Sequence, residues 1–420
     1  MEKEWTVFYL IKAVDTDTMR PLVQMLRKLT TVVLPDNIAI VFCINFFKGN
    51  LEAILQTNPD LVIPDRDMKN FTTYFFELVN IGRTSAIKII EERPGLLVTE
   101  PDDLQNFLVL KTLSKYQANR YLLFTWDHGN GFGIFSGATG PTEIIKSNVN
   151  VPVLTMEELS QALSRTMGER KIDLMIMMNC LMQVFNTGYT LRHNVEYLIA
   201  PQTLLGFEDY DYQKLFQKLV DDPGIPADAL ALYVIQCFTD NENTRGPFPV
   251  RLNMRAVSAC NLNHFDKLGV LLAQLTVKLT HRLPTIFCEL RRSFFQSQGV
   301  YLKPKLVDLF SLLNNLQTTE QDERQWIDEM LALEKQCVPR LFRGKGLPKS
   351  APRLTYHGIS ISSPIEVPVA RYSLIQKIMR FFPRQPQKDM LLTYEATDAW
   401  STLVKQMESM ESAGAAKNCP

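Results

Sequence analysis

Two short apolar segments constrain the fold of this chain more than any other feature. One runs from Arg120 to Trp126 and leads into His128, and the other runs from Lys171 to Met178 and leads into Cys180. Continuous apolar runs rich in β-branched or aromatic residues are typical of central strands in a parallel sheet covered on both faces. The carboxyl ends of such strands share one edge of the sheet, where the loops open a crevice for ligands. We therefore expect His128 and Cys180 to be neighbours in space.

A histidine beside a cysteine indicates nucleophilic catalysis. The thiolate is the reactive form of cysteine, and a nearby imidazole can take the thiol proton. Attack on an amide also creates an oxyanion, which backbone N–H groups in tight turns can stabilise. The N–H groups of Gly129 and Cys180 are the candidates, because a glycine lets the backbone approach a substrate closely. We also expect residues 181–193 to form a helix whose positive end favours the thiolate.

Several motifs together resemble the clostripain family of cysteine peptidases, which shares its fold with caspases, gingipains, legumains and separases. The strong motifs are Trp126-Asp-His-Gly-Asn-Gly-Phe, Asp173-Leu with Asn179-Cys-Leu-Met, and Tyr197-Leu-Ile-Ala. Weaker similarities lie at Trp5-Thr-Val, residues 99–108, Val307-Asp-Leu, His357-Gly-Ile-Ser-Ile and Trp400. A histidine roughly fifty residues before the cysteine is also the caspase spacing. The resemblance implies a cysteine endopeptidase that works through a thioester, with His128 as general base and Cys180 as nucleophile.

The same resemblance implies a caspase-like three-layer α/β fold, with a mostly parallel central sheet flanked by helices and with helical additions at the C-terminus. Family members often mature by cleavage in a loop between the two strands, and some bind calcium. Residues 137–154 have no periodicity and form the longest loop beside the site, so Lys146 is the expected cut point for an enzyme that prefers basic residues. The residues themselves indicate no cofactor and no metal site, and calcium is implied by the family alone.

One position departs from the family pattern. Clostripain-like enzymes usually carry an aspartate two positions before the nucleophile, which pairs with a basic residue before the scissile bond, but here the position holds Met178. Alternate residues of a strand point to the same side, so Met178 should form the pocket floor beside Cys180. A thioether cannot neutralise a buried guanidinium, so we expect a preference for an uncharged or apolar residue. Basic specificity would need an acid from the loop after the next strand, and the candidates there are Glu208, Asp209 and Asp211, with Asp209 preferred.

Strand and helix patterns alternate through the first part of the chain, which favours right-handed crossovers and a parallel sheet. We expect residues 1–245 to form a catalytic core and residues 246–410 a mostly helical C-terminal portion with added strands, packed on the core. Residues 411–420 are small and polar, so we expect a flexible tail. Two prolines and a charged cluster predict a loop over residues 48–83, before a short strand at residues 85–90.

Composition limits the partners and the location of the chain. The 420 residues carry 45 Lys plus Arg and 45 Asp plus Glu, so no overall field favours nucleic acid or an anionic membrane. No apolar run approaches the roughly 18 residues that span a bilayer, and the first residues lack a leader pattern, so a cytoplasmic location is expected. Seven cysteines without a Cys-x-x-Cys pair are expected to be reduced and to form no zinc site. Five of them lie within apolar patterns and are expected in the core: Cys43, Cys237, Cys260, Cys288 and Cys337.

Two other functions stay open. The alternative to a peptidase is a catalytically silent caspase-like scaffold that binds a partner protein or peptide, although the intact His128 and Cys180 pair counts against it. Transpeptidation by the same pair is a different acyl transfer, which product masses would separate from hydrolysis. In each case the expected partner is a protein or peptide, and the oligomeric state is not indicated by the sequence.

Overall fold

The computed structural model divides into two compact units, which are described in turn. The first comprises Met1–Met182 and His193–Arg245, and the second comprises Gln183–Arg192 and Gly246–Pro420. The structure describes residues 3–13, 16–47, 71–94, 104, 115–131, 133–135, 154–206, 209–242, 255–301, 305–344, 356–367 and 395–419.

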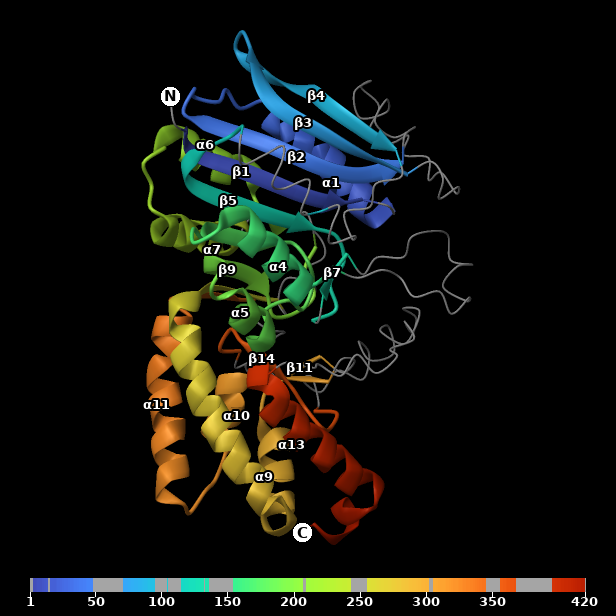
Figure 1. Ribbon diagram of the computed structural model, residues 1–420, viewed down its shortest axis with the longest axis vertical. Coiled ribbons are helices and arrows are strands. Elements are labelled where there is room, and N and C mark those ends of the chain that lie inside the picture. Colours follow the sequence, from blue (N-terminus) through green and yellow to red (C-terminus); the bar gives the residue numbers. More distant parts are fainter. Residues whose placement is uncertain are drawn as a thin grey trace. The chain divides into compact units, whose positions relative to one another are not determined.

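The strands of the first unit form a mixed sheet in the order β9-β8-β5-β1-β2-β3-β4 (Figure 1). Neighbours from β9 to β2 pair in parallel, whereas β3 and β4 are antiparallel additions at one edge. The mostly parallel sheet expected from the sequence is confirmed. The strands are β1 (Lys3–Lys12), β2 (Ile38–Phe47), β3 (Phe71–Ile81), β4 (Thr84–Pro94), β5 (Ala118–Trp126), β8 (Ile172–Met177) and β9 (Val195–Pro201), with a separate pair β6 (Gly133–Ile134) and β7 (Leu154–Thr155).

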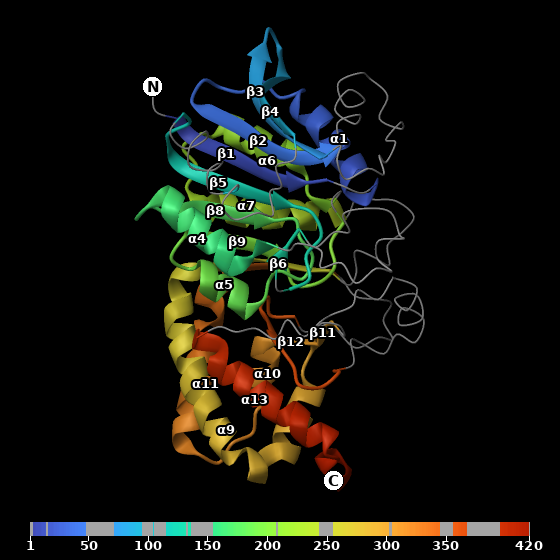
Figure 2. The same ribbon diagram turned by 45° about the vertical axis from the view of Figure 1, so that its right-hand side comes forward.

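Helices cover both faces of this sheet. Figures 1 and 2 show α4 on one face and α6 and α7 on the opposite face, where α1 contacts α6. The helix α4 begins with a capping box in which Thr155 accepts the Glu158 N–H and the Glu158 side chain accepts the Thr155 N–H. The helices are α1 (Thr16–Leu29), α4 (Met156–Met167), α6 (Tyr212–Asp221) and α7 (Ala227–Glu242).

A row of stacked aromatic rings crosses the face of the sheet that α6 covers. The Tyr9 ring lies 4.4 Å from Phe124 and 4.7 Å from Phe42, and Phe42 lies 4.7 Å from Phe76. Phe216 of α6 packs over this row, with its ring centre 6.2 Å from that of Tyr9. The row joins β5, β1, β2 and β3, so it holds in register the strands that lead to the edge where the candidate site lies.

The strand β3 occupies sequence that was expected to be a loop. The predicted loop over residues 48–83 includes Phe71–Ile81, which pairs with both β2 and β4. Its residues from Thr72 to Phe76 are buried, because this strand lies between two neighbours in the sheet. The prolines that suggested a loop precede this strand, in residues outside the described part of the chain. The following strand, β4, is longer than the predicted residues 85–90 and ends at Pro94.

The second unit is built around the long helix α9. This helix runs from Phe265 to Gln296 with Pro284 inside it, and it contacts α11 and α13. The strands of the second unit form two antiparallel groups, which are the pair β10 and β13 and the small sheet β11-β12-β14. The elements are α5 (Phe185–Leu191), β10 (Ala256–Asn261), η5 (Leu262–His264), α9 (Phe265–Gln296), β11 (Gly299–Tyr301), β12 (Leu306–Asp308), α10 (Leu309–Asn315), α11 (Gln321–Cys337), β13 (Arg340–Arg343), β14 (Ser360–Ser362), α13 (Glu395–Ser412) and η6 (Ala415–Asn418).

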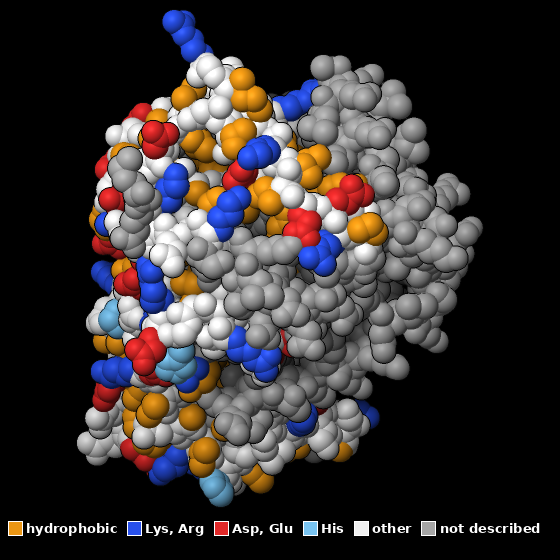
Figure 3. Space-filling view, turned by 45° about the horizontal axis from the view of Figure 1, so that its top comes forward, with side chains coloured by type: hydrophobic (Ala, Val, Ile, Leu, Met, Phe, Trp, Pro, Cys, Tyr) orange, Lys and Arg blue, Asp and Glu red, His pale blue; other side chains and the backbone are white. Residues whose placement is uncertain are grey.

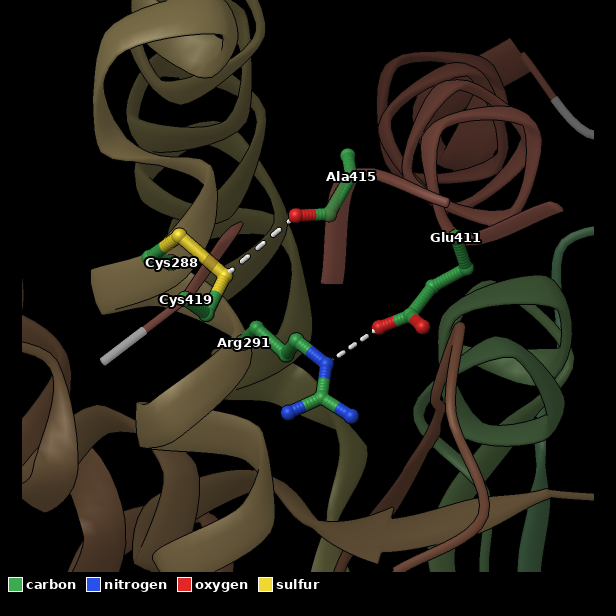
Figure 4. The surroundings of a disulfide bond; sticks show 5 residues. All are labelled: Cys288, Arg291, Glu411, Ala415 and Cys419. Carbon is green, nitrogen blue, oxygen red and sulfur yellow. Dashed lines mark hydrogen bonds and ion pairs between the residues drawn. A yellow bond between two sulfur atoms is a disulfide. The ribbon is translucent and has the colours of Figure 1, made fainter. Parts of the chain in front are cut away.

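A disulfide joins α9 to the end of the chain. Cys288 and Cys419 are bonded across 131 positions of sequence, and Arg291 forms an ion pair with Glu411 beside them (Figure 4). The expectation that all cysteines are reduced is therefore wrong for this pair. The tail expected to be flexible instead includes the end of α13 and the short helix η6, and the disulfide fixes it to α9.

The described surface mixes both charge signs. On the face drawn in Figure 3, Lys and Arg side chains are interspersed with Asp and Glu side chains, without a large patch of one sign among the residues described there. Among the helices within the described ranges, none combines the length and the apolar character that crossing a bilayer requires.

Candidate active site

The hairpin that carries His128 begins where β5 ends. Gly129 and Ile134 form an antiparallel bridge. Between them, the Asn130 N–H donates to Gly133 O at 3.4 Å, and Asn130 Oδ1 accepts the Gly133 N–H at 3.1 Å. These two bonds between Asn130 and Gly133 close the turn, and half-buried His128 stands at the first position of the hairpin.

Cys180 lies in a sharp turn after β8. The Met178 N–H donates to Thr125 O at 2.8 Å, so the pairing of β8 with β5 continues beyond the last strand residue. The next residue after Cys180, Leu181, has a positive φ of 64°, and its N–H donates to Thr203 O at 3.3 Å. This turn leaves Cys180 half-buried at the carboxyl edge of the sheet.

The two turns meet at Gly129. A Cβ atom added to Gly129 would lie 2.7 Å from Cys180 O and 2.8 Å from Asn179 Cβ. Such distances are too short for non-bonded atoms, so only glycine allows the backbone at position 129 to approach Asn179 and Cys180 this closely. The structure therefore brings together the two strand ends that the sequence singled out, including both proposed oxyanion donors.

Asn179 is a residue of the site that the sequence reading missed. Its side chain is fully buried, and its Oδ1 accepts the Thr125 hydroxyl at 2.6 Å. Its Nδ2 donates to Asp127 O at 3.0 Å and to His128 O at 3.3 Å. The amide therefore ties the turn of the cysteine to the turn of the histidine. A single amide directly after an apolar strand is the sequence signal that could have identified it.

The thiol of Cys180 lies against the loop that follows β9. Its Sγ accepts the Leu205 N–H at 3.4 Å and lies 3.5 Å from Leu205 O, to which the thiol can donate. The sulfur is therefore held between the N–H and C=O groups of Leu205. The loop after β9 is thus part of the site.

The other free cysteines of the structure are buried: Cys43, Cys237, Cys260 and Cys337. Burial raises the pKa of Cys237 to about 11 and that of Cys337 to about 12. Burial likewise raises the pKa of Cys43 and of Cys260 well above the ordinary value for a thiol. These thiols stay protonated at neutral pH. Their burial confirms the expected placement in the core, whereas Cys180 is half-buried. The fifth cysteine expected in the core, Cys288, is in the disulfide.

The helix expected directly after the nucleophile begins later. The structure has α5 over Phe185–Leu191, and residues 181–184 form turns and a bridge. The prediction of a helix over residues 181–193 is therefore wrong at both ends. Because the effect of a helix end fades within about one turn, α5 does not supply the positive end that was expected at Cys180.

The predicted pocket residues have different surroundings. Met178 is buried at the end of β8, with 1% of its surface exposed. Asp209 Oδ2 accepts the Gly206 N–H at 2.7 Å, which places this carboxylate in the turn that follows Leu205. Asp211 is the N-cap of α6, where it accepts the Lys214 N–H at 3.1 Å. Asp209 therefore lies in the loop that touches the thiol, whereas Asp211 has a structural role in starting a helix.

Tyr210 lies between Asp209 and Asp211 in the loop after β9. The side chain is buried, and its ring packs edge-on against Phe238 at 4.4 Å. Burial raises the pKa of Tyr210 far above its ordinary value, and the charges of Asp209 and Cys180 raise it further. Two of the predicted site residues, Glu208 and Lys146, lie outside the described residues. Within the described residues, no group of three or more His, Cys, Asp or Glu side chains could hold a metal ion.

Residues 91–339 match the profile of the clostripain family, Peptidase C11. The chain belongs to this family of cysteine peptidases. No curated protein sequence matches it. Membership agrees with the motifs around His128 and Cys180, which both lie within the matched residues.

Solved structures of clostripain-family proteases share the fold. A secreted C11 cysteine protease from Bacteroides thetaiotaomicron, iotapain, superposes with a TM-score of 0.60 at 16% identity, covering 86% of this chain and 94% of that one. A structure of a secreted C11 protease from the same organism in complex with an irreversible peptide inhibitor has a TM-score of 0.59 at 15% identity and covers 90% of this chain and 97% of that one. An inactive zymogen from Parabacteroides distasonis has a TM-score of 0.58 at 17% identity, with 86% and 92% covered. The expected α/β class is thus confirmed for this clostripain-family chain.

Proposed function

We propose that this chain is a cysteine endopeptidase in which Cys180 is the nucleophile and His128 is the general base. The observation that carries the proposal is the contact of the two turns at Gly129, where a Cβ atom would lie 2.7 Å from Cys180 O. Family membership supports it, because the matched family consists of cysteine peptidases. The half-buried state of both side chains supports it as well, since each can meet a substrate.

The proposed reaction is an acyl transfer through a thioester. The Cys180 thiol gives its proton to His128, and the sulfur attacks the carbonyl carbon of the scissile bond. The N–H groups of Gly129 and Cys180 then stabilise the oxyanion of the tetrahedral intermediate. Collapse of the intermediate breaks the C–N bond, and His128 returns the proton to the leaving amine. A water molecule, deprotonated by His128, then attacks the thioester carbon. The C–S bond breaks to release the acid product, and His128 returns the proton to the Cys180 sulfur.

Selective alkylation of Cys180 is the test of this proposal. At neutral pH the native protein should react with iodoacetamide first at Cys180, because burial holds the pKa of Cys237 near 11 and that of Cys337 near 12. Mass-spectrometric mapping of the labelled residues gives the order. His128→Ala should slow the reaction at Cys180 and leave the buried thiols unchanged. Faster labelling of another cysteine, or no effect of His128→Ala, would favour the non-catalytic scaffold.

For the substrate, we propose an uncharged or apolar residue before the scissile bond. Met178 stands where the family usually has aspartate, and its buried thioether offers no charge to a guanidinium or ammonium group. Asp209 is the acid that could reverse this preference, because it lies in the loop that touches the thiol.

A positional peptide library should show this preference directly. We expect cleavage after apolar residues to exceed cleavage after Arg or Lys by about tenfold or more, as for a charge without a partner in a buried pocket. Met178→Asp should shift cleavage toward basic residues, and Asp211→Asn is the matched control, since Asp211 caps α6. Strong cleavage after Arg or Lys that is lost in Asp209→Ala and kept in Met178→Ala would show that the acidic loop sets specificity instead.

Self-cleavage at Lys146 stays a prediction, because this residue lies outside the described part of the chain.

The expected cytoplasmic location is also a prediction, and two observations count against it. The Cys288–Cys419 disulfide fits an oxidising compartment. The similar proteases from Bacteroides thetaiotaomicron are also described as secreted.

A further inference from the structure

A lysine is buried beside the strand that leads to His128. Lys12 is the last residue of β1, and 2% of its surface is exposed. The pairing of β1 with β5 places Ile11 opposite Trp126, so the next residue pair along the two strands is Lys12 and Asp127. Their side chains form a buried ion pair, with Lys12 Nζ 3.8 Å from Asp127 Oδ2. Burying a charge is unfavourable unless the charge is paired, so the buried ammonium group of Lys12 depends on such compensating contacts.

The same ammonium group reaches the far end of the His128 hairpin. Lys12 Nζ donates to Phe135 O at 2.8 Å, and Phe135 is fully buried with a positive φ of 64°. Asp127 directly precedes His128, and Phe135 directly follows Ile134, which closes the hairpin by its bridge to Gly129. Lys12 therefore binds both ends of the hairpin at its base.

The hairpin is held from the opposite side by Asn179. This amide donates to Asp127 O and His128 O from the turn that carries the nucleophile. In the sheet, β5 lies between β8 and β1. The strand that leads to His128 is therefore flanked by the strand that leads to Asn179 and by the strand that ends at Lys12. Each neighbouring strand thus contributes one buried polar side chain to the backbone around His128.

We propose that Lys12 is a positioning residue that sets the place of the His128 imidazole relative to the Cys180 sulfur. It acts by fixing the two ends of the hairpin, and it does not touch the substrate. The inference rests on the proposed function, in which His128 takes the Cys180 proton. A small displacement of such a base has a large effect on rate, because proton transfer depends on hydrogen-bond geometry.

Lys12→Met tests the proposal, since methionine keeps the apolar length of the side chain and removes the charge and the donor. Hydrogen exchange of the peptide that spans residues 127–135, followed by mass spectrometry, should become about tenfold faster or more. For peptide hydrolysis, kcat should fall by about 10- to 100-fold with KM within about twofold, as for a displaced catalytic group. The pH profile of Cys180 alkylation should move toward that of His128→Ala.

A second variant separates positioning from simple charge neutralisation. Lys12→Met combined with Asp127→Asn leaves no buried unpaired charge, so it keeps the test available if Lys12→Met alone does not fold. The double variant should still show fast exchange in the hairpin and the altered alkylation profile, because Phe135 O has lost its donor. Wild-type exchange and a wild-type profile in the double variant would overturn the proposal. Lys3→Met, at the other end of β1, is the matched control and should leave both readouts unchanged.

Failure of this inference and failure of the proposed function give different results. If His128→Ala has no effect on Cys180 alkylation, the dyad is wrong, while hydrogen exchange in the Lys12 variants still decides whether Lys12 fixes the hairpin. If His128→Ala slows alkylation and the Lys12 variants behave as the wild type in both readouts, the dyad stands and the role of Lys12 is wrong.

Discussion

Replacing Cys180 with alanine is expected to abolish peptide hydrolysis, and replacing His128 with alanine should lower kcat by about 10²- to 10⁴-fold. In the proposed mechanism the sulfur forms the covalent intermediate, so no other group can substitute for it. The imidazole would contribute proton transfer alone, so some activity should persist through thiolate formed at higher pH. Hydrolysis of a peptide library between pH 6 and pH 9 measures both effects. The His128→Ala variant should gain activity as the pH rises, because a larger fraction of its thiol is then ionised.

Cys237→Ala is the matched control for this experiment. Its thiol lies in the same unit, is buried, and has a pKa raised to about 11 by that burial. The variant should retain the wild-type pH profile and rate. Full activity in Cys180→Ala would contradict the mechanism, and full activity in His128→Ala would contradict the assignment of the base.

Breaking the disulfide should have the largest effect on stability. The bond between Cys288 and Cys419 closes 131 positions of sequence, and the chain-entropy model assigns about 5 kcal/mol to a loop of that size. That value is a large part of the 5 to 15 kcal/mol typical of folded domains. Cys288→Ala combined with Cys419→Ala should therefore lower the free energy of unfolding of the second unit by several kcal/mol. Denaturant titration followed by hydrogen exchange in α9 and α13 measures the change.

Reduction of the wild-type protein provides the control. Dithiothreitol should lower the stability of the wild type and leave the double alanine variant unchanged. Cys337→Ala removes a buried thiol from the same unit without touching the disulfide, and it should respond to the reductant as the wild type does. Alkylation of all seven cysteines in denaturant without reductant would show that the bond is absent.

The fold was predictable where apolar patterns decide it. The segments before His128 and Cys180 are buried along most of their length, so their composition alone indicates central strands. The strand β3 could not be predicted in this way, because the prolines before it favour a loop whereas its own apolar and β-branched residues favour a strand. The helix after Cys180 begins later than its pattern indicates, because the apolar periodicity extends into residues 181–184. Tertiary contacts hold these residues out of the helix, as the Leu181 N–H bond to Thr203 O shows.

The candidate catalytic residues could be proposed from the sequence, but the side chains that hold their backbone in place could not. Asn179 and Lys12 act through contacts to backbone carbonyls of residues far away in the sequence. Such contacts have no periodicity, so they become visible only once the strands are placed side by side. The disulfide was missed for a similar reason, because its two cysteines have no motif spacing and lie 131 positions apart.

The conformation of Leu181 has a consequence for the turn that carries Cys180. A left-handed backbone is unfavourable for a leucine by about 1 to 2 kcal/mol, yet this residue adopts a φ of 64° directly after Cys180. Its side chain is buried, with 3% of its surface exposed, and this burial offsets the strain. Apolar packing therefore selects the turn that aims the sulfur. The turn is preorganised before any substrate arrives, and glycine at this position would permit the same turn without enforcing it.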